Sequence, residues 1–210
     1  MCYRFYMEMS EELRPIVEAA NRSALGAKMV AALGRPIKTQ GEIRPTDIVP
    51  VLAPNRAGRQ AVFPMLWGFT LEGRTSPVVN ARSETAAQKP TFRESWRTRR
   101  CVIPASYYFE WEHLINAAGQ KKTGDKFMLQ TPDSEMTWLA GLYRMETRLD
   151  LRFPVFTVLT RPPGDSIRFI HDRMPLILPK SAVSAWLSPN ADPAAVAAQA
   201  LTDPAFEKTI

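Results

Sequence analysis

The sequence predicts a strand-rich α+β domain with short helices at the edges of its sheet. The chain has 210 residues and is 45% hydrophobic, which is ordinary for one globular domain with a substantial core. Its 18 prolines outnumber its 10 glycines, and this favours many short elements and rigid turns over a bundle of long helices. Short runs rich in β-branched and aromatic residues recur between turn signals, as in strands. We therefore expect a single domain over residues 1–210.

The amino-terminal part of the chain is expected to form a strand and then a helix. Residues 2–7 alternate weakly between apolar and polar side chains and predict the first strand. Ser10 has the side chain of a helix cap, and Pro15 is tolerated in the opening turns of a helix that starts just after Ser10. Apolar residues at helical spacing predict helix over residues 17–33, and Gly34 is suited to end it.

Strands and short helices are expected to alternate along the rest of the chain. A turn at residues 44–46 precedes an apolar strand at residues 48–52. Near the end, Asp192 is expected to cap a helix that opens with Pro193. Further strands are predicted at residues 61–69, 101–103, 107–111, 127–130, 138–143 and 154–159, and further helices at residues 91–99, 165–170, 181–187 and 193–201.

The composition argues against several classes of protein. No stretch is long and apolar enough to span a membrane, and the amino terminus lacks the basic-then-apolar order of a signal peptide. Two cysteines, Cys2 and Cys101, form no disulfide framework. The two histidines and two cysteines show no spacing typical of a zinc site. We therefore expect a reduced, cytoplasmic, monomeric protein that needs no metal or other cofactor.

The charge of the chain favours an anionic partner. The net charge is +6 and the isoelectric point is near 9.5. Four arginines crowd residues 93–100, a segment that also holds Trp96 and directly follows Phe92. Arginine interleaved with aromatic residues suits single-stranded nucleic acid, because cations neutralise phosphates while aromatic rings stack on bases. A solvated helix face explains the same pattern equally well.

Cys2 is the residue with the most distinctive chemistry. If Met1 is removed, the thiol and the terminal amine lie on one residue, and such a 1,2-aminothiol condenses with an aldehyde to a five-membered thiazolidine. Both groups are partly activated near neutrality, with ordinary pKa values of about 8 for the amine and about 8.5 for the thiol. The alternative is that Cys2 is a small buried hydrophobic residue of the first strand.

Three polar residues lie in contexts that present side chains from a rigid scaffold. Asn80 follows an apolar run, Glu110 lies in the aromatic run 107–111, and His171 precedes the sequence Asp-Arg-Met-Pro. The aromatic surroundings of Glu110 should raise its pKa if the carboxyl is buried. Taken singly, each residue has an ordinary structural explanation. Asn80 could satisfy the backbone of a turn, Glu110 could lie on the polar side of an edge strand, and His171 could cap a helix.

Taken together, these residues resemble one family. The motifs that carry the resemblance are Met1-Cys2-Tyr3-Arg4-Phe5, Asn80-Ala81-Arg82-Ser83-Glu84-Thr85, Arg100-Cys101-Val102-Ile103-Pro104-Ala105-Ser106, Phe109-Glu110-Trp111, Ala140-Gly141-Leu142-Tyr143 and His171-Asp172-Arg173-Met174-Pro175. In this order they are similar to the SRAP family of SOS-response-associated peptidases, also called abasic-site processing proteins. The resemblance runs from Cys2 to about Leu187, nearly the whole chain.

The resemblance implies a fold and a chemistry. It implies a single SRAP-like α+β domain, built on a mostly antiparallel, barrel-like sheet with short peripheral helices. It also implies a sensor of abasic sites in single-stranded DNA that forms a thiazolidine crosslink through Cys2. By position, Cys2 is the nucleophile, Asn80 supports the crosslinked cysteine, and Glu110 and His171 are the acid/base pair. We expect these four residues to share one concave site.

The resemblance further implies how DNA is held. Tyr3 and Tyr107 stand where the family usually has glycine. The implied partner is single-stranded DNA containing abasic sites, with the protein associated with the nucleoid when bound. Phosphate contacts are implied for Arg4, Arg82 and Arg173, and weaker DNA-facing positions for Pro45, Trp67 and Thr160.

Two other functions stay open at this point. With Cys2 as nucleophile, His171 as base and Glu110 as the group that orients it, the chain would be a cysteine peptidase, at least for removal of Met1 in cis. A noncatalytic module that binds single-stranded nucleic acid, with a structural Cys2, is the third interpretation. A covalent DNA adduct distinguishes the first function from both of these.

Overall fold

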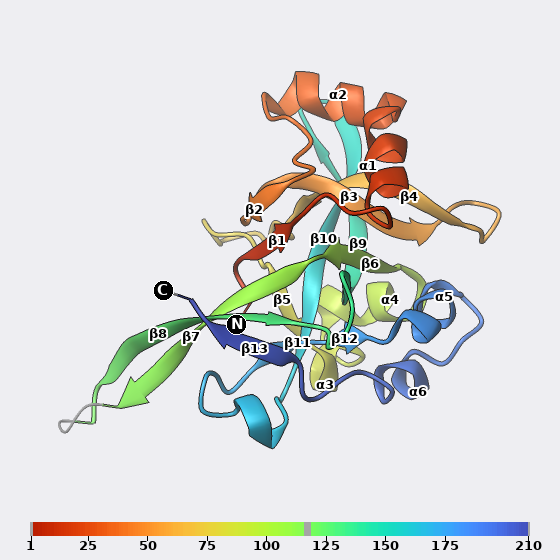
Figure 1. Ribbon diagram of the computed structural model, residues 1–210. Coiled ribbons are helices and arrows are strands. Elements are labelled where there is room, and N and C mark those ends of the chain that lie inside the picture. Colours follow the sequence, from red (N-terminus) through yellow and green to blue (C-terminus); the bar gives the residue numbers. More distant parts are fainter. Residues whose placement is uncertain (1, 116–118, 210) are drawn as a thin grey trace.

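The computed structural model describes residues 2–115 and 119–209, and Figure 1 shows the order of its elements. No helix in this described part is long and apolar enough to cross a membrane. The strands are β1 (Phe5–Met7), β2 (Gly41–Ile43), β3 (Ile48–Pro54), β4 (Gln60–Trp67), β5 (Asn80–Arg82), β6 (Arg100–Ala105), β7 (Tyr107–Ile115), β8 (Lys121–Gln130), β9 (Thr137–Arg148), β10 (Leu151–Arg161), β11 (Met174–Pro175), β12 (Ile177–Leu178) and β13 (Ala205–Lys208). The helices are α1 (Arg14–Asn21), α2 (Ala24–Leu33), α3 (Ser83–Ala86), α4 (Pro90–Thr98), α5 (Lys180–Leu187) and α6 (Pro193–Ala197), with a 3-10 turn η1 (Asp165–Ile167).

Five strands close into a barrel. β10 pairs with β4, β4 with β3, β3 with β6, β6 with β9, and β9 pairs back with β10. Each of these pairings is antiparallel except that of β10 with β4. β6 is buried along its whole length, as expected for a strand of a filled barrel. The predicted α+β fold, with a mostly antiparallel, barrel-like sheet, is confirmed.

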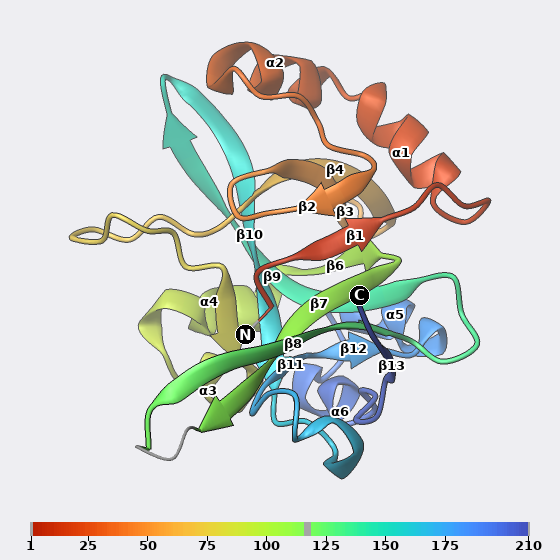
Figure 2. The same cartoon turned by 60° about the vertical axis from the view of Figure 1, so that its left-hand side comes forward.

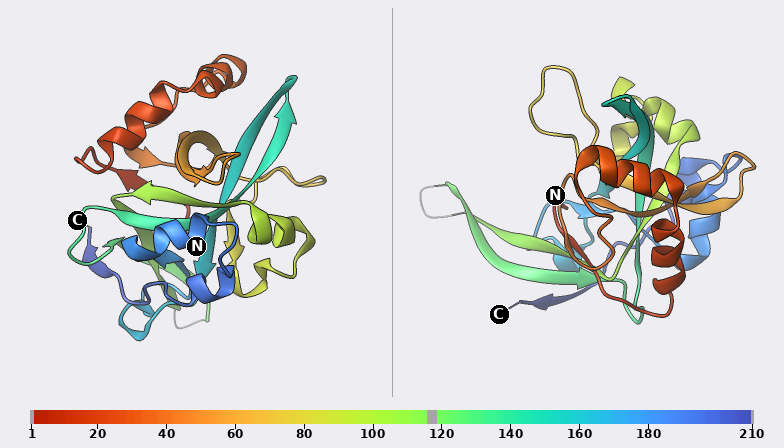
Figure 3. Two further views of the ribbon diagram at one scale, coloured as in Figure 1. Left: turned by 90° about the vertical axis from the view of Figure 1, so that its right-hand side faces the viewer. Right: turned by 90° about the horizontal axis from the view of Figure 1, so that it is seen from above.

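A second sheet lies across the barrel and carries the amino-terminal strand. Its order is β13-β8-β7-β1-β2, and Figure 2 shows β1, β7 and β8 in front of the barrel strands. The two sheets contact each other through the rings of Phe5 and Trp67, whose centroids lie 5.2 Å apart. The helices are peripheral: α1 and α2 lie at one end of the molecule, away from α5 and α6 (Figure 3). The site described below forms where the two sheets meet.

The first helix starts later than the sequence predicts. It begins at Arg14, not just after Ser10. Ser10 instead closes a preceding turn, in which its hydroxyl accepts a hydrogen bond from the Leu13 N–H at 3.1 Å. Pro15 then lies in the first turn of α1, where its missing N–H costs nothing.

The helix predicted over residues 17–33 is two helices. Ser23 interrupts it, because its extended backbone and its hydroxyl, which accepts from the Gly26 N–H at 3.2 Å, cap the start of α2. Gly34 ends α2 in the left-handed conformation with φ 64°, as predicted.

Near the other end of the chain, Asp192 caps α6 as predicted. The helix ends at Ala197 and is shorter than the predicted range of residues 193–201.

The arginine-rich segment is a helix whose aromatic residues face inward. The rings of Phe92 and Trp96 are buried, with Trp96 packed edge-on against Trp186 at 5.8 Å. Arg93 and Arg97 are exposed, whereas Arg100 is buried and donates to the backbone carbonyls of Trp96 and Trp186. Because the two rings are buried, they are not available to stack on bases, and the solvated-face interpretation holds for the exposed arginines but not for Arg100. Elsewhere, the helix predicted at residues 165–170 is not formed, and the structure has only the 3-10 turn η1 there.

Candidate functional site

Cys2 is fully buried just ahead of β1. The side-chain amide of Asn80 donates a hydrogen bond to the Cys2 carbonyl oxygen at 2.9 Å. The Cys2 thiol points to the backbone carbonyl of Arg4, with 3.9 Å between sulfur and oxygen. The Arg4 carbonyl also accepts from the Phe109 N–H of β7 at 3.0 Å, and β1 begins at Phe5 and not at residue 2 as predicted.

Asn80 reaches Cys2 because β5 is anchored to the barrel. β5 pairs in parallel with β10, with Asn80 opposite Val158 and Arg82 opposite Thr160. Ala81 is buried between them. Since successive side chains of a strand point to opposite faces, Asn80 and Arg82 project together from the other face, toward the site.

β7 brings Tyr108 and Glu110 to one buried face. The exposed fractions are 0% for Tyr108 and 5% for Glu110. Burial raises the pKa of Glu110 to about 7, as expected for a carboxyl among aromatic residues. Burial, with the Glu110 carboxylate adding to it, raises the pKa of the Cys2 thiol well above its usual range. The carboxyl therefore titrates near neutrality, and the resting sulfur is a thiol.

His171 lies beside Glu110, with 4.0 Å between its Nε2 and the Glu110 Oε2. Its Nδ1 accepts a hydrogen bond from the Arg173 backbone N–H at 2.9 Å. The Arg173 N–H favours the neutral tautomer with its proton on Nε2, whereas the Asp172 carboxylate beside Nδ1 favours the tautomer with its proton on Nδ1. The Asp172 carboxylate lies 2.8 Å from Nδ1 and is the counter-ion when the ring is fully protonated.

A cavity of about 580 Å³ opens onto these groups. Glu110 and His171 line it together with Arg4, Arg82 and Arg173, which come from the segment before β1, from β5 and from the segment before β11. The structure thus brings together the predicted acid/base pair and the three predicted phosphate-binding arginines. Cys2 and Asn80 are not among the lining residues. Of the four residues expected to share one concave site, the cavity is therefore lined by Glu110 and His171, while Cys2 is fully buried.

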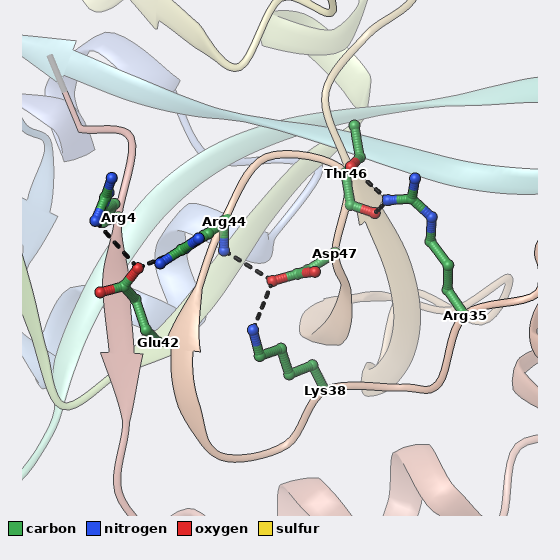
Figure 4. Close-up of polar contacts among 7 residues, drawn as sticks. All are labelled: Arg4, Arg35, Lys38, Glu42, Arg44, Thr46 and Asp47. Atoms are coloured by element: carbon green, nitrogen blue, oxygen red, sulfur yellow. Dashed lines mark hydrogen bonds and ion pairs between the residues drawn. The ribbon is translucent and has the colours of Figure 1, made fainter.

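Arg4 is held between a carboxylate and an aromatic ring, as Figure 4 shows in part. Glu42 accepts hydrogen bonds from Arg4 Nη1 at 3.3 Å and from Arg44 Nε at 2.6 Å. The Arg4 guanidinium also lies 5.2 Å from the ring centroid of Trp111. One carboxylate shared by two arginines leaves a surplus of positive charge at this wall of the cavity.

Pro45 lies in the turn that precedes β3. The predicted turn at residues 44–46 is present, and the Asp47 carboxylate closes it by accepting from the Arg44 N–H at 2.8 Å. The same carboxylate pairs with Lys38 at 3.1 Å. Pro45 is partly exposed, so a contact with DNA at this position stays a prediction.

Arg173 is paired within the protein. Its guanidinium donates to both carboxylate oxygens of Glu84, at 2.5 and 2.9 Å, and to the carbonyl of Thr160 at 2.7 Å. The hydrogen bond from Arg173 lowers the pKa of Glu84 to about 2. The arginine is therefore held in position at the cavity wall with part of its charge compensated.

Two predicted DNA-facing side chains are fully buried in the structure. Trp67 donates its indole N–H to the Val79 carbonyl at 3.0 Å, and the Thr160 hydroxyl donates to the Ala81 carbonyl at 3.4 Å. Neither side chain has exposed surface in this structure, so a contact of either one with DNA stays a prediction. Both instead fix the segment that carries Asn80 and Arg82.

Two residues of the site were not predicted from the sequence. The Tyr108 hydroxyl is buried and has no hydrogen-bond partner among the described residues, and strand alternation with Glu110 was the signal that would have placed it. His113 lines the cavity, and its ring centroid lies 3.9 Å from that of His171. With Asp172, the two histidines form a group of possible metal ligands within 4.8 Å of one another. The Arg173 N–H already occupies one of the His171 nitrogens.

The fold and the site define a small α+β barrel protein with a cysteine, a carboxyl and an imidazole beside a basic cavity. The chain belongs to the SRAP family, described as SOS response associated peptidase, whose model matches residues 1–210. This agrees with the resemblance found in the motifs.

Named relatives and solved structures resemble parts or all of the chain. It is 36% identical over 118 residues to the abasic site processing protein YobE of Bacillus subtilis, covering 55% of this chain and 52% of that protein. It is 29% identical over 128 residues to the abasic site processing protein YedK of Escherichia coli, covering 59% and 54% of the two chains. The chain thus spans about half the length of these curated relatives. A crystal structure of a Bacteroides thetaiotaomicron protein has a TM-score of 0.70 at 20% identity, covering 94% of this chain and 86% of the other, and shows that the fold is shared. A Bordetella bronchiseptica protein has a TM-score of 0.68 at 20% identity and full coverage of both chains.

Proposed function

We propose that this chain processes abasic sites in single-stranded DNA by forming a covalent thiazolidine with the ring-opened sugar through Cys2. The observation that carries the proposal is the setting of Cys2, a buried cysteine whose carbonyl is held by Asn80 and whose thiol is influenced by the charge of Glu110, a carboxyl with a pKa of about 7. The names of the relatives from Bacillus subtilis and Escherichia coli support the same lesion. The proposal includes removal of Met1, because only a terminal Cys2 has a free amine.

The chemistry proceeds in two bond-forming steps. The Cys2 amine adds to the C1′ aldehyde to give a carbinolamine, which loses water to form an iminium ion. The thiol then adds to the same carbon, its proton leaves, and the ring closes. The overall change joins an aldehyde, an amine and a thiol and releases one water molecule. Glu110, with its pKa near 7, supplies the proton that the departing hydroxyl needs and accepts one back during ring closure.

The side-chain oxygen of Asn80 has a second role in this reaction. Its side-chain nitrogen is committed to the Cys2 carbonyl, so its Oδ1 is the available acceptor. That oxygen is buried and has no hydrogen-bond partner among the described residues. A buried acceptor without a partner costs free energy, on the order of 1–3 kcal/mol. An N–H of the free Cys2 amine, or the N–H that remains on the thiazolidine nitrogen, would satisfy it and would hold the reacting nitrogen in place.

The resting state of the thiol argues against the peptidase alternative. A cysteine peptidase attacks with a thiolate, which needs a lowered pKa. Here burial and the neighbouring Glu110 carboxylate raise the pKa of Cys2. A thiol that reacts second, on an adjacent iminium carbon, does not need that activation, because the reaction is intramolecular. The amine-first order therefore fits the site better.

The arginines explain how DNA is brought to the site. Arg4, Arg82 and Arg173 line one cavity with Glu110 and His171. Contacts to phosphates position a strand without reading its sequence, and an abasic sugar has no base edge to read. Selectivity for the lesion then comes from the aldehyde chemistry. Binding of phosphates by basic side chains also accounts for the excess of positive charge of the chain.

Intact-mass spectrometry tests the proposal. The protein is mixed separately with abasic single-stranded DNA, with the same strand undamaged, and with a short peptide. We expect a covalent adduct only with abasic DNA, with the summed mass less one water, and a protein component that lacks Met1. Cleavage of the peptide without a DNA adduct would establish the peptidase instead. Reversible binding of both strands without any adduct would establish a noncatalytic binding module.

A further inference from the structure

A second polar cavity lies beyond the turn that precedes β3. Its volume is about 380 Å³, and the loop of residues 70–77 forms much of its wall. Its hydroxyl-bearing and cationic lining residues are Thr46, Thr70, Thr75, Ser76, Arg74 and Arg148. No carboxylate is among the lining residues in the described part of the chain. Guanidinium and hydroxyl groups are the side-chain groups that proteins use to bind phosphate oxygens.

A shared carboxylate fixes the loop of residues 70–77 to the barrel. Glu146 of β9 accepts from the Thr70 N–H at 2.8 Å. It also accepts from Arg144 Nη2 at 2.7 Å and from Arg148 Nη2 at 2.9 Å. Because one carboxylate serves two arginines, a surplus of positive charge stays at this cavity. The carboxylate of the loop itself, Glu72, does not line the cavity.

Thr46 has a strained backbone at the edge of the second cavity. Its φ is 72°, in the left-handed region that a β-branched residue rarely adopts. Arg35 Nη1 secures this conformation by donating to the Thr46 carbonyl at 3.0 Å and to its hydroxyl at 2.5 Å (Figure 4). The Thr46 N–H also donates to the Trp67 carbonyl at 2.9 Å. Strain of this kind is concentrated at binding sites, and here it brings a further guanidinium to the cavity.

Charged side chains join this cavity to the one lined by Glu110 and His171, which we call the reactive cavity. Arg4 lines the reactive cavity, and Thr46 lines the second one. The other residues that Figure 4 shows with these two are Arg35, Lys38, Glu42, Arg44 and Asp47. The row holds four cationic side chains and two carboxylates. A strip with a surplus of positive charge therefore links the two cavities.

We propose that the second cavity binds a phosphate of the same DNA strand, a few nucleotides away from the abasic sugar. The identity of the strand rests on the proposed function. The backbone from Glu42, which pairs with Arg4, to Thr46 spans at most about 15 Å. A few nucleotides cover that length, since phosphates follow one another about every 3.4 Å along a stacked strand. Anchoring at two points sets the direction in which the strand crosses the site.

Arg74 is the residue best placed to reach that phosphate. It is exposed and lines the second cavity, and no ion pair is recorded for its side chain among the described residues. Arg148, by contrast, is committed to Glu146 and to the Thr70 hydroxyl. Because Arg74 is exposed, its replacement leaves the packing of the barrel intact.

The first readout uses undamaged single strands and does not depend on the adduct. Binding of strands of about 4 and about 12 nucleotides is measured by competition at several salt concentrations. We expect Arg74→Ala to weaken binding of the long strand and to reduce its slope of log affinity against log salt by about 0.7, for one phosphate contact. Binding of the short strand should not change, because it fills the reactive cavity alone. Arg56→Ala is the matched control, since Arg56 is an exposed arginine that lines neither cavity.

The second readout tests the direction of the strand. Abasic strands are extended from the lesion on the 5′ side only or on the 3′ side only. At low DNA concentration, Arg74→Ala should slow adduct formation with one of these extensions and not with the other, because the second cavity lies on one side of the reactive one.

Three results would overturn the second cavity as part of the DNA path. They are equal losses of affinity for short and long strands, equal slowing with both extensions, and binding of inorganic phosphate that depends on Arg74 without any effect of strand length. The last result would make the cavity a site for free phosphate. If the parent protein forms no adduct, the proposed function fails, and the undamaged strands still decide whether the second cavity binds DNA.

Discussion

The side-chain amide of Asn80 donates a hydrogen bond to the backbone carbonyl of Cys2, across 78 positions of the chain. This bond fixes which end of the amide is the donor, and it leaves Oδ1 as a buried acceptor beside Cys2. It also joins β5, which is anchored on the barrel, to the segment that leads into the second sheet. The position of the reactive residue is therefore set by the barrel.

Removing this anchor should slow the chemistry more than it weakens DNA binding. We expect Asn80→Ala to lower the free energy of unfolding by about 1 kcal/mol, for one hydrogen bond. The rate of adduct formation should fall by about tenfold or more, because the aminothiol is no longer aligned. Gel analysis of adducts over time, with anisotropy of labelled undamaged DNA, separates the two effects. Asn190→Ala, an exposed site, is the control. Equal losses of rate and affinity would show that Asn80 acts only through folding or DNA binding.

Glu110 should make stability depend on pH. Burial raises its pKa from 4.5 to about 7, so the folded protein binds this proton more tightly than the unfolded chain. The stabilisation is complete below the unfolded pKa, declines as the pH rises and is lost above the folded pKa of about 7. The total change is on the order of 3 kcal/mol. Urea unfolding between about pH 4 and pH 8 should show a decline that Glu110→Gln removes.

Glu84 provides the matched control for this pH dependence. The hydrogen bond from Arg173 lowers the pKa of Glu84 to about 2, which is the opposite sign. Its contribution is therefore present above its ordinary pKa of 4.5 and is lost only as the pH falls toward about 2. We expect Glu84→Gln to leave the decline between pH 4.5 and about 7 unchanged. A parent and a Glu110→Gln variant with equal pH profiles would contradict the assignment to Glu110.

The motifs predicted which residues lie close together, namely Cys2 with Asn80 and Glu110 with His171, better than local patterns predicted the geometry of the site. Glu110 was expected to have a raised pKa from its aromatic neighbours alone, and the structure agrees. Tyr108 was missed, although strand alternation with Glu110 was visible in the sequence. His113 could not be placed, because only a bulge brings it to the same cavity as Glu110. A bulge depends on the register of a partner strand, which no local pattern contains.

In the fold, too, features set by neighbouring residues were predicted better than features set by residues far apart in the chain. Caps and terminators such as Asp192 and Gly34 were predicted correctly because their hydrogen bonds are local. The closure of the barrel by β4, β9 and β10 was implied only by the family resemblance, since strand pairing is set by residues far apart in the chain. The sequence left open whether Phe92 and Trp96 could stack on bases, and the structure shows that both rings are buried. Their spacing of one helical turn was the sign of a buried face.

Arg82 should contribute to DNA binding through charge alone. Its side chain is exposed at the cavity, and no ion pair is recorded for it among the described residues. We expect Arg82→Ala to weaken binding of undamaged single strands and to reduce the slope of log affinity against log salt by about 0.7, for one phosphate contact. Anisotropy titrations at several salt concentrations measure both. Arg56→Ala is the control, because Arg56 is an exposed arginine away from this cavity. Equal slopes for the parent and Arg82→Ala would remove Arg82 from the DNA path.

The last prediction separates the aminothiol from a simple thiol nucleophile. Cys2→Ser keeps the terminal amine and a hydroxyl, so a Schiff base can still form. A hydroxyl is a far weaker nucleophile than sulfur near neutrality, so closure to an oxazolidine should be poor. We expect a Cys2→Ser adduct that borohydride traps but heating destroys, while the parent adduct survives heating without reduction.

A protein with a blocked amine and an intact thiol provides the complementary test to Cys2→Ser. A chain that retains Met1, or carries extra residues ahead of Cys2, keeps the thiol but lacks the free amine on Cys2. We expect it to form neither the borohydride-trapped nor the heat-stable adduct, while its affinity for undamaged single strands stays within about twofold, because the arginines still provide the phosphate contacts. A thiol acting alone would tolerate the extension. A heat-stable adduct from the blocked protein would therefore refute the aminothiol mechanism, and a loss of DNA affinity would show that the added residues obstruct the cavity.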